Sequence, residues 1–143
     1  MVRVVNDSVT IANRLRPVLV RLGRELRREI HSLGVTGTQV SFLGAIKHEP
    51  GITASELAER ERVSAPGMSG HLVRLEAANL IERVRGADRR RIGLFITPEG
   101  DKVLKSVRNK RTTLLAGRLE KLGPDERERI EGAIDALERL LED

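Results

Sequence analysis

Apolar side chains recur every three or four residues over the first part of the chain, which is the spacing of one face of an α-helix. This pattern extends from residue 9 to residue 33. The stripe consists of Ile11, Leu15, Val18, Leu22, Leu26 and Ile30, with Leu19 and Leu33 beside it. We therefore expect a long amphipathic helix that ends at Gly34. Pro17 lies inside the stripe and is expected either to kink this helix or to mark its true start.

Three shorter helices are predicted next, and each begins with a capping residue. Thr36 and Thr53 stand three residues before a glutamine and a glutamate, the capping-box arrangement that satisfies free backbone N–H groups. Ser64 is a suitable N-cap for the third helix, and Asn79 suits the left-handed position that ends it. The predicted ranges are about 36–48, 53–60 and 64–78.

A β-hairpin is predicted after these helices. The segment 91–97 alternates between apolar side chains and others, and a first strand is expected at 80–85. The intervening Gly86-Ala87-Asp88 sequence is typical of a hairpin turn. Helical spacing then returns at the end of the chain. The last two predicted helices span 98–121 and 124–141.

Composition excludes several classes of function. The 143 residues suit either one domain or a domain with dimerisation arms. The absence of cysteine excludes a disulfide scaffold, a zinc finger and a thiol redox sensor. The three histidines lie on separate predicted elements, and no phosphate-binding glycine motif is present. We therefore expect no metal, no cofactor and no enzymatic activity. The sequence has no signal pattern and no apolar run long enough for a membrane span, so the expected location is the cytoplasm.

Charge is distributed unevenly along the chain. Residues 1–124 contain 23 Lys and Arg against 13 Asp and Glu, whereas residues 125–143 contain 3 against 8. A basic body with an acidic last helix indicates a polyanion-binding surface on one part of the molecule. The hairpin contributes Arg83, Arg85, Arg89, Arg90 and Arg91. Asp88 is expected to orient the guanidinium of Arg90, because residues two apart on an extended chain point the same way.

The order of the predicted elements points to nucleic acid. The helices at 53–60 and 64–78, joined by a tight turn, meet the requirement of a helix-turn-helix, and the hairpin adds a wing. The second helix would enter the major groove of duplex DNA, and arginine of the wing would enter the minor groove. The predicted fold class is mostly α with a small β-hairpin wing (α+β), in which further helices flank a winged helix-turn-helix lobe.

Several short motifs together are specific. They are Thr53-Ala-Ser-Glu-Leu-Ala58, Val63-Ser64, Leu72-Val-Arg-Leu-Glu76, Leu80-Ile-Glu-Arg83, Asp88-Arg-Arg90 and Ile96-Thr97-Pro-Glu-Gly100. In these motifs the chain resembles the MarR family of transcription regulators. The resemblance implies a homodimer on a pseudo-palindromic operator, usually a repressor released by a small molecule. It also implies a DNA-binding lobe at 36–97, between dimerisation helices at 1–35 and 98–143.

Candidate DNA-binding residues follow from this interpretation. They are Ser64, Pro66, Ser69, His71 and Arg74 in the second helix of the pair, and Arg85, Asp88, Arg89, Arg90 and Arg91 in the wing. The second helix departs from the family pattern, because Gly70 stands where many members have arginine. Affinity is therefore expected to depend on phosphate contacts and the wing more than on this helix.

A small apolar or anionic effector is a further expectation, since ligand pockets of the family lie between the dimerisation helices and the DNA-binding lobe. Arg16, His31 and Arg111 are candidates to meet an anion, and Phe42 is a candidate apolar wall. Two alternatives stay open at this point. One is an architectural or constitutive DNA-binding regulator without a small-molecule switch. The other is a winged-helix module that binds protein, although protein interfaces usually enrich aromatic residues and this chain has only two Phe.

Overall fold

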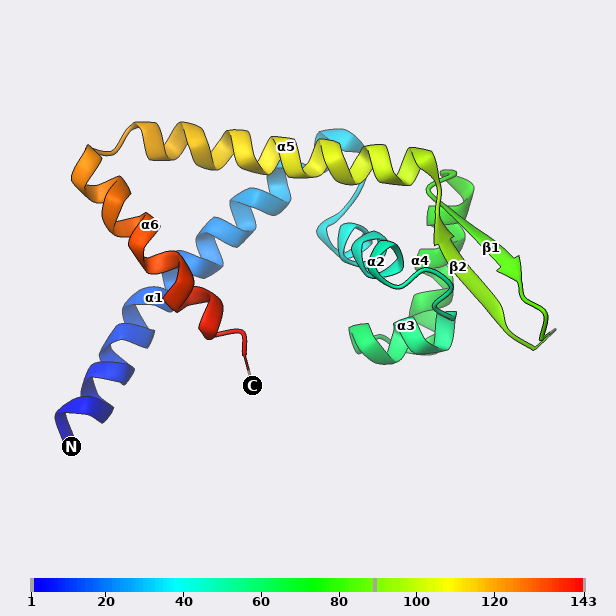
Figure 1. Cartoon of the computed structure of the whole chain (residues 1–143), viewed down its shortest axis with the longest axis horizontal. Helices are drawn as coiled ribbons and strands as arrows, with labels where there is room; N and C mark the ends of the chain where they lie inside the picture. Colours follow the sequence, from blue (N-terminus) through cyan, green and yellow to red (C-terminus); the bar gives the residue numbers. More distant parts are fainter. Residues whose placement is uncertain (1, 89, 143) are drawn as a thin grey trace.

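The structure, a computed structural model, describes residues 2–88 and 90–142, with side chains from residue 7 onward. Its elements are α1 (Val2–Glu29), the 3-10 turn η1 (His31–Leu33), α2 (Gly37–His48), α3 (Ala54–Glu61), α4 (Ala65–Ala77), β1 (Ile81–Arg85), β2 (Ile92–Ile96), α5 (Pro98–Glu120) and α6 (Pro124–Arg139). Figure 1 shows an elongated molecule in which α2, α3, α4 and the hairpin gather at one end. We refer to residues 36–97 as the lobe and to α1, α5 and α6 as the arms.

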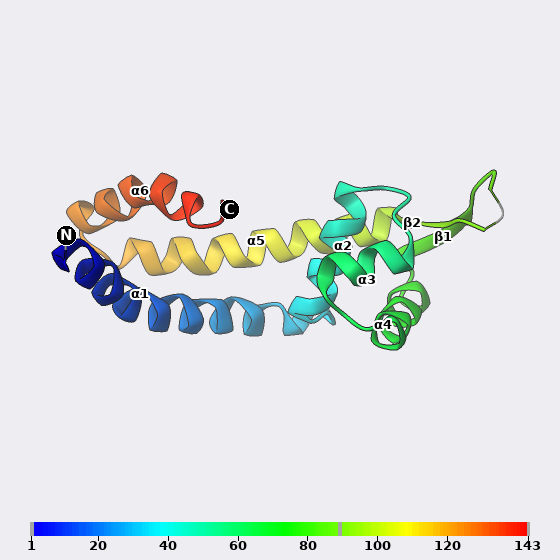
Figure 2. The same ribbon diagram turned by 90° about the horizontal axis from the view of Figure 1, so that it is seen from below.

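The long helix α5 connects the two parts of the molecule. Figure 2 shows α1 and α6 on opposite sides of α5, and Figure 1 shows both helices running at an angle to it. Polar contacts hold α1 and η1 to α5: Arg118 forms an ion pair with Glu25 of α1 at 2.8 Å, and the Lys110 ammonium donates to the hydroxyl of Ser32 in η1 at 2.7 Å. The arm formed by α1 is therefore fixed to the helix that carries the lobe.

The first helix differs from its prediction at both ends. It begins at Val2 and continues through Pro17 to Glu29, so the proline lies inside the helix and does not mark its start. Residues 31–33 form a 3-10 turn, which Gly34 closes with a φ of +76°. Glycine adopts this left-handed conformation without steric cost. Apolar spacing alone did not reveal the change, because the last turn of a helical stripe reads the same in α and 3-10 geometry.

The predicted caps are confirmed. The Thr36 hydroxyl accepts the Gln39 backbone N–H at 3.1 Å, and the Gln39 side chain accepts the Thr36 N–H in return. Asn79, beyond the end of α4, adopts a left-handed φ of 61°, as its residue type predicted. These local signals determine where α2 and α4 begin and end.

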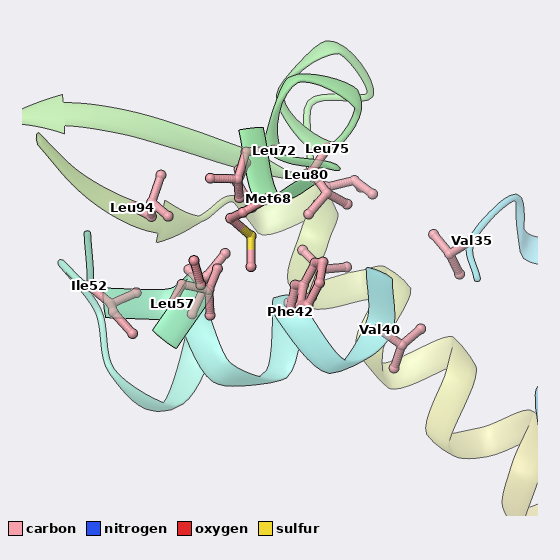
Figure 3. Packing of buried hydrophobic residues seen from close by; sticks show 14 of the residues in the cluster. Val35, Val40, Phe42, Ile52, Leu57, Met68, Leu72, Leu75, Leu80 and Leu94 are labelled. Atoms are coloured by element: carbon pink, nitrogen blue, oxygen red, sulfur yellow. The ribbon is translucent and has the colours of Figure 1, made fainter. Parts of the chain in front are cut away.

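The hydrophobic core lies in the lobe, where side chains from three helices and the hairpin meet (Figure 3). The side chains with at most 2% exposure there are Phe42, Leu43, Ile46, Ile52, Leu57, Met68, Leu72, Leu75, Ile81 and Leu94. Ile30 and Val107, outside the lobe, join the same cluster. The lobe therefore buries its own apolar stripes and anchors one end of α1 and α5.

The strand β2 also contacts the segment before α3. The Leu94 N–H donates to the Ile52 carbonyl at 2.8 Å, and the Gly51 N–H donates to the Leu94 carbonyl at 2.9 Å. A Cβ on Gly93 would lie 3.0 Å from the Gly51 Cα, so glycine permits this close approach. The contact fixes the base of the wing against the start of α3.

The junction between β2 and α5 is tightly packed. The Thr97 hydroxyl donates to the Asn79 carbonyl at 2.6 Å and accepts the Gly100 N–H at 3.0 Å. A Cβ on Gly100 would lie 2.2 Å from the Leu80 carbonyl oxygen, which no real contact allows. The first turn of α5 therefore lies directly against the chain that enters β1.

Candidate nucleic-acid interface

The helices α3 and α4 form a helix-turn-helix with specific local contacts. Thr53 and Glu56 form the predicted capping box at the start of α3, with the Thr53 hydroxyl accepting the Glu56 N–H at 3.2 Å. Arg62 takes a left-handed φ of 55° in the turn, and the Val63 N–H donates a hydrogen bond to the Ala58 carbonyl. The Ser64 hydroxyl then accepts the Gly67 N–H at 3.2 Å, so the predicted site residue Ser64 is the N-cap of α4.

The helix α4 has one buried face and one exposed face. Met68, Leu72 and Leu75 are at most 1% exposed and hold the helix on the core. The opposite face carries Pro66, Ser69, Gly70, Val73 and Arg74, all exposed. Three predicted DNA-binding residues of α4, at positions 66, 69 and 74, therefore lie on the surface that a major groove would meet.

His71 differs from the other candidates of α4. Its side chain is half-buried, and its ring lies edge-on to Phe42, with centroids 5.1 Å apart. Within the described residues, its Nδ1 atom is buried without a hydrogen-bond partner. The side chain of His71 thus lies between α4 and α2. It is not on the exposed face that carries Ser69 and Arg74.

The loop of the wing is ordered by Asp88 in a way that the sequence did not predict. The Asp88 carboxylate accepts the backbone N–H of Arg90 at 3.1 Å, whereas we expected it to orient the Arg90 guanidinium. The Asp88 carbonyl also accepts the Arg91 N–H at 2.9 Å. Aspartate commonly bonds to backbone two residues ahead in turns, and this local geometry competes successfully with a side-chain ion pair. Arg89, also predicted for the site, lies outside the described residues.

The arginines of the wing and of α4 fall into two groups. Arg91 forms an ion pair with Glu56 at 2.8 Å, and Arg83 forms one with Glu76 at 3.4 Å, so both connect the wing to the helices. The other group consists of Arg74 on α4 with Arg85 and Arg90 on the wing. These three are exposed and have no acidic partner among the residues that the structure describes.

A basic hollow lies between the wing and the start of α3. It has a volume of about 450 Å³, and its polar lining consists of Arg83, Arg90 and Arg91 together with Thr53, Ser55 and Asp88. The Thr53 hydrogen bonds and the Arg91 ion pair hold the pKa of the Glu56 carboxyl below its ordinary value of 4.5. That carboxylate is therefore charged at neutral pH and keeps Arg91 in place.

Thr53, Ser55 and Arg83 were missing from the predicted site. The capping motif predicted where α3 starts, but not that the wing would lie against it. The isolated bridge between Ile52 and Leu94 produces this neighbourhood. A bridge of one residue pair has no periodic pattern, so the Gly51 and Gly93 pair was the only trace of it in the sequence.

The predicted effector residues lie in different places. A hollow of about 610 Å³ between the arms and the lobe is lined by Phe42, Arg111, Arg27, Ser41 and others. His31 lines a neighbouring hollow of about 350 Å³ together with Arg24, Arg27 and Arg28. Arg16 is exposed on α1, where it donates to Asn13 at 3.0 Å, and it lines neither hollow.

Two short helices joined by a tight turn, with an arginine-bearing hairpin beside them, define a winged helix-turn-helix DNA-binding protein. A sequence model of the MarR family matches residues 33–92. The chain is also 32% identical over 113 residues to the HTH-type transcriptional repressor MdtR of Bacillus subtilis, an alignment that covers 78% of this chain and 73% of that protein. The chain belongs to the MarR family and is a DNA-binding transcription regulator.

Solved structures share the fold over almost the full length. A putative transcriptional regulator from Pseudomonas aeruginosa PA01 has a TM-score of 0.83 and 31% identity, covering 96% of this chain and 98% of that one. A point mutant of Staphylococcus aureus MepR, solved bound to an oligodeoxyribonucleotide, has a TM-score of 0.71 and 21% identity, covering 92% and 97%. At 21% identity, this second likeness shows the fold alone.

No helix in the part of the chain that the structure describes is long and apolar enough to cross a membrane. No group of three or more His, Cys, Asp or Glu residues there has the arrangement of a metal site.

Proposed function

We propose that this protein is a homodimeric repressor that binds a pseudo-palindromic duplex operator and releases it when a small apolar anion binds between the arms and the lobe. The observation that carries DNA binding is the set of exposed arginines without acidic partners among the described residues, Arg74, Arg85 and Arg90, on α4 and the neighbouring wing. Such groups gain most from phosphate, because binding releases condensed counterions without breaking an internal ion pair.

The dimer is supported by the apolar surface of the arms. Val18 and Leu19 on α1 are 51% and 50% exposed, and Ile134 and Leu137 on α6 are 46% and 37% exposed. Soluble monomers seldom leave apolar patches of this kind uncovered. In a homodimer, the apolar stripes of α1 and α6 in one copy would pack against the same stripes of the second copy. The two-fold axis would then present one lobe to each of two half-sites.

The effector is supported by the polar groups of the hollow between arms and lobe. The Arg111 Nε atom is buried there without a hydrogen-bond partner among the described residues. A buried donor of this kind costs free energy until an acceptor reaches it. Phe42 and Leu26 line the same space, so the hollow combines the cations Arg27 and Arg111 with an apolar wall. Glu61 also lines it, and its carboxylate accepts the Ser41 hydroxyl at 2.8 Å. An aromatic carboxylate has the matching chemistry.

The test of DNA binding compares single arginine variants on a duplex selected from a random pool. For roughly 6–10 phosphate contacts, affinity should fall about 10³–10⁵-fold between about 50 and 200 mM salt. Arg90→Ala should cost about 1–3 kcal/mol per half-site, and Arg129→Ala on α6 serves as the matched control. Wild-type affinity in Arg90→Ala, together with complete loss in Arg74→Ala, would contradict a wing-dominated interface.

The test of the effector uses benzoate as a probe. Benzoate should weaken the wild-type DNA complex, and Arg111→Gln should reduce this response while leaving DNA affinity without benzoate unchanged. A panel of aromatic and aliphatic carboxylates that leaves the DNA complex intact would favour the alternative of a constitutive regulator without a small-molecule switch.

A further inference from the structure

The exposed face of α4 has an unusual chemistry for a helix that meets DNA. The sequence of α4 contains no Asn, Gln or Lys, and Arg74 is the one arginine in this helix. Guanine and adenine are normally read by bidentate hydrogen bonds from arginine, lysine, asparagine or glutamine. The helix therefore has few groups with which to read a purine edge.

At the centre of this exposed face lies an apolar side chain. Val73 is 56% exposed and follows Gly70 and Pro66 by three and seven residues, so the three share one face, opposite to Leu72 and Leu75. Val73, Val84 and Ile92 are the large apolar side chains that stay exposed within the described part of the lobe. A second copy packed on the arms would explain the exposed residues of α1 and α6, but not Val73.

Gly70 is not required by packing inside the chain. A Cβ at this position would meet no atom within 4 Å, and its backbone is helical without a positive φ. Glycine within a helix costs about 1 kcal/mol relative to alanine. One turn before Val73, the missing Cβ lets the helix backbone come closer to a surface outside the protein.

Thymine is the base that an apolar side chain can identify in the major groove. Its C5-methyl group is the one apolar feature among the base edges there, and contact with it discriminates thymine from cytosine. A branched aliphatic side chain on the outward centre of α4 matches that methyl group. It would gain nothing from the N7 and O6 acceptors of guanine.

We propose that Val73 is a specificity-determining residue, which packs against the methyl group of a thymine in each half-site, and that Gly70 permits the approach. This inference rests on the proposed binding of duplex DNA as a dimer. It identifies which feature of the operator α4 reads: thymine methyl groups in the major groove, in place of a purine hydrogen-bonding pattern.

The experiment replaces thymines in the selected duplex by deoxyuridine, one symmetric pair at a time. This change removes the methyl group and keeps the O4 acceptor and the pairing with adenine. At one thymine of each half-site, wild-type affinity should fall about fourfold per half-site, the size expected for removing one buried methyl group. In Val73→Ser the same deoxyuridine change should have no effect, because the contact is already lost.

Val84→Ser is the matched control, since Val84 is an exposed valine on the wing and its variant should keep the full deoxyuridine penalty. An unchanged penalty in Val73→Ser, with wild-type DNA binding intact, would overturn this inference alone. A wild-type protein that selects no duplex at all would overturn the proposed function as well. Thermal unfolding of each variant confirms that it is folded.

Gly70→Ala provides the second variant. It should raise the thermal midpoint, because alanine favours the helix. It should also lower affinity for the selected duplex at least about threefold, because the added Cβ holds the helix away from the bases and weakens the apolar contact. Unchanged affinity together with a raised midpoint would overturn the role assigned to Gly70.

Discussion

Leu72 in α4 and Leu137 in α6 both lie on the apolar stripes of their helices, yet their surroundings differ. Leu72 is 0% exposed, whereas Leu137 is 37% exposed, and no residue of the described α6 is buried. The lobe therefore satisfies its apolar stripes within one chain. The arms carry stripes of the same kind that a single chain leaves open, and in the proposed dimer a second copy would cover them.

Truncation after Gly123 is the strongest challenge to this comparison. Removal of α6 takes away an entire exposed stripe and should convert the dimer to a monomer. Without a linked second lobe, DNA affinity should fall at least about 100-fold, because the second half-site loses its high effective concentration. Sedimentation and gel-shift titration measure both effects. A truncated chain that remains dimeric would show that α6 is not part of the interface.

Leu72→Ala and Leu137→Ala test the comparison by concentration dependence. Leu72→Ala should lower the free energy of unfolding by about 2–5 kcal/mol at every protein concentration, since it leaves a cavity in the lobe. Leu137→Ala should destabilise mainly at low concentration, where dissociation of the dimer contributes to unfolding. Denaturant titrations at two well-separated protein concentrations distinguish these outcomes. If both variants lost the same free energy of unfolding at both protein concentrations, the distinction between lobe and arms would be wrong.

Gly100→Ala and Gly117→Ala compare the two ends of α5. The added Cβ at Gly100 would collide with the Leu80 carbonyl, so this variant should lose about 1–3 kcal/mol of stability. Gly117 has no neighbour within 4 Å, and Gly117→Ala should gain about 0.5–1 kcal/mol from helix propensity. Thermal unfolding is the measurement. A stable Gly100→Ala would mean that the junction relaxes easily.

Glu56→Gln is expected to have the smallest effect on stability of these variants. It tests whether an ion pair on the surface of the lobe contributes to folding. The Thr53 hydrogen bonds and Arg91 lower the pKa of the folded Glu56 carboxyl below 4.5. Its contribution is therefore present above pH 4.5 and is lost as pH falls through the lowered pKa. Between about pH 6 and pH 3 the thermal midpoint of the wild type should fall more than that of Glu56→Gln. Parallel curves would exclude a contribution from this carboxylate.

Local chemistry determined how much of the molecule was predictable from sequence. Thr36, Thr53 and Asn79 were assigned correctly, because a cap or a left-handed position depends on residues within one turn. The paired strands and the tight turn before α4 followed from short patterns in the same way. The family motifs then combined these elements into a winged helix-turn-helix lobe.

The contacts that the sequence did not predict are of two kinds. Some join elements that are distant in sequence, and others depend on which of two available partners a side chain binds. Arg91 reaches Glu56, 35 residues earlier, and no spacing rule connects them. Asp88 selected a backbone N–H over a guanidinium. His71 stands at the edge of the buried face of α4, where helical spacing left its direction undecided until Phe42 was placed beside it.

The hydrogen bonds of Thr97 join the wing directly to the start of α5, so a rigid α5 would act on the wing as a lever. The helix has 23 residues, a length of roughly 35 Å at about 1.5 Å per residue. A tilt of about 5° at one end therefore displaces the other end by roughly 3 Å, about the length of one hydrogen bond. Because Gly100 and Thr97 leave no loop between the wing and α5, a small repacking of the arms would be carried to the wing arginines. In the proposed dimer, the spacing of the two wings on DNA would thus depend on packing at the far end of the molecule.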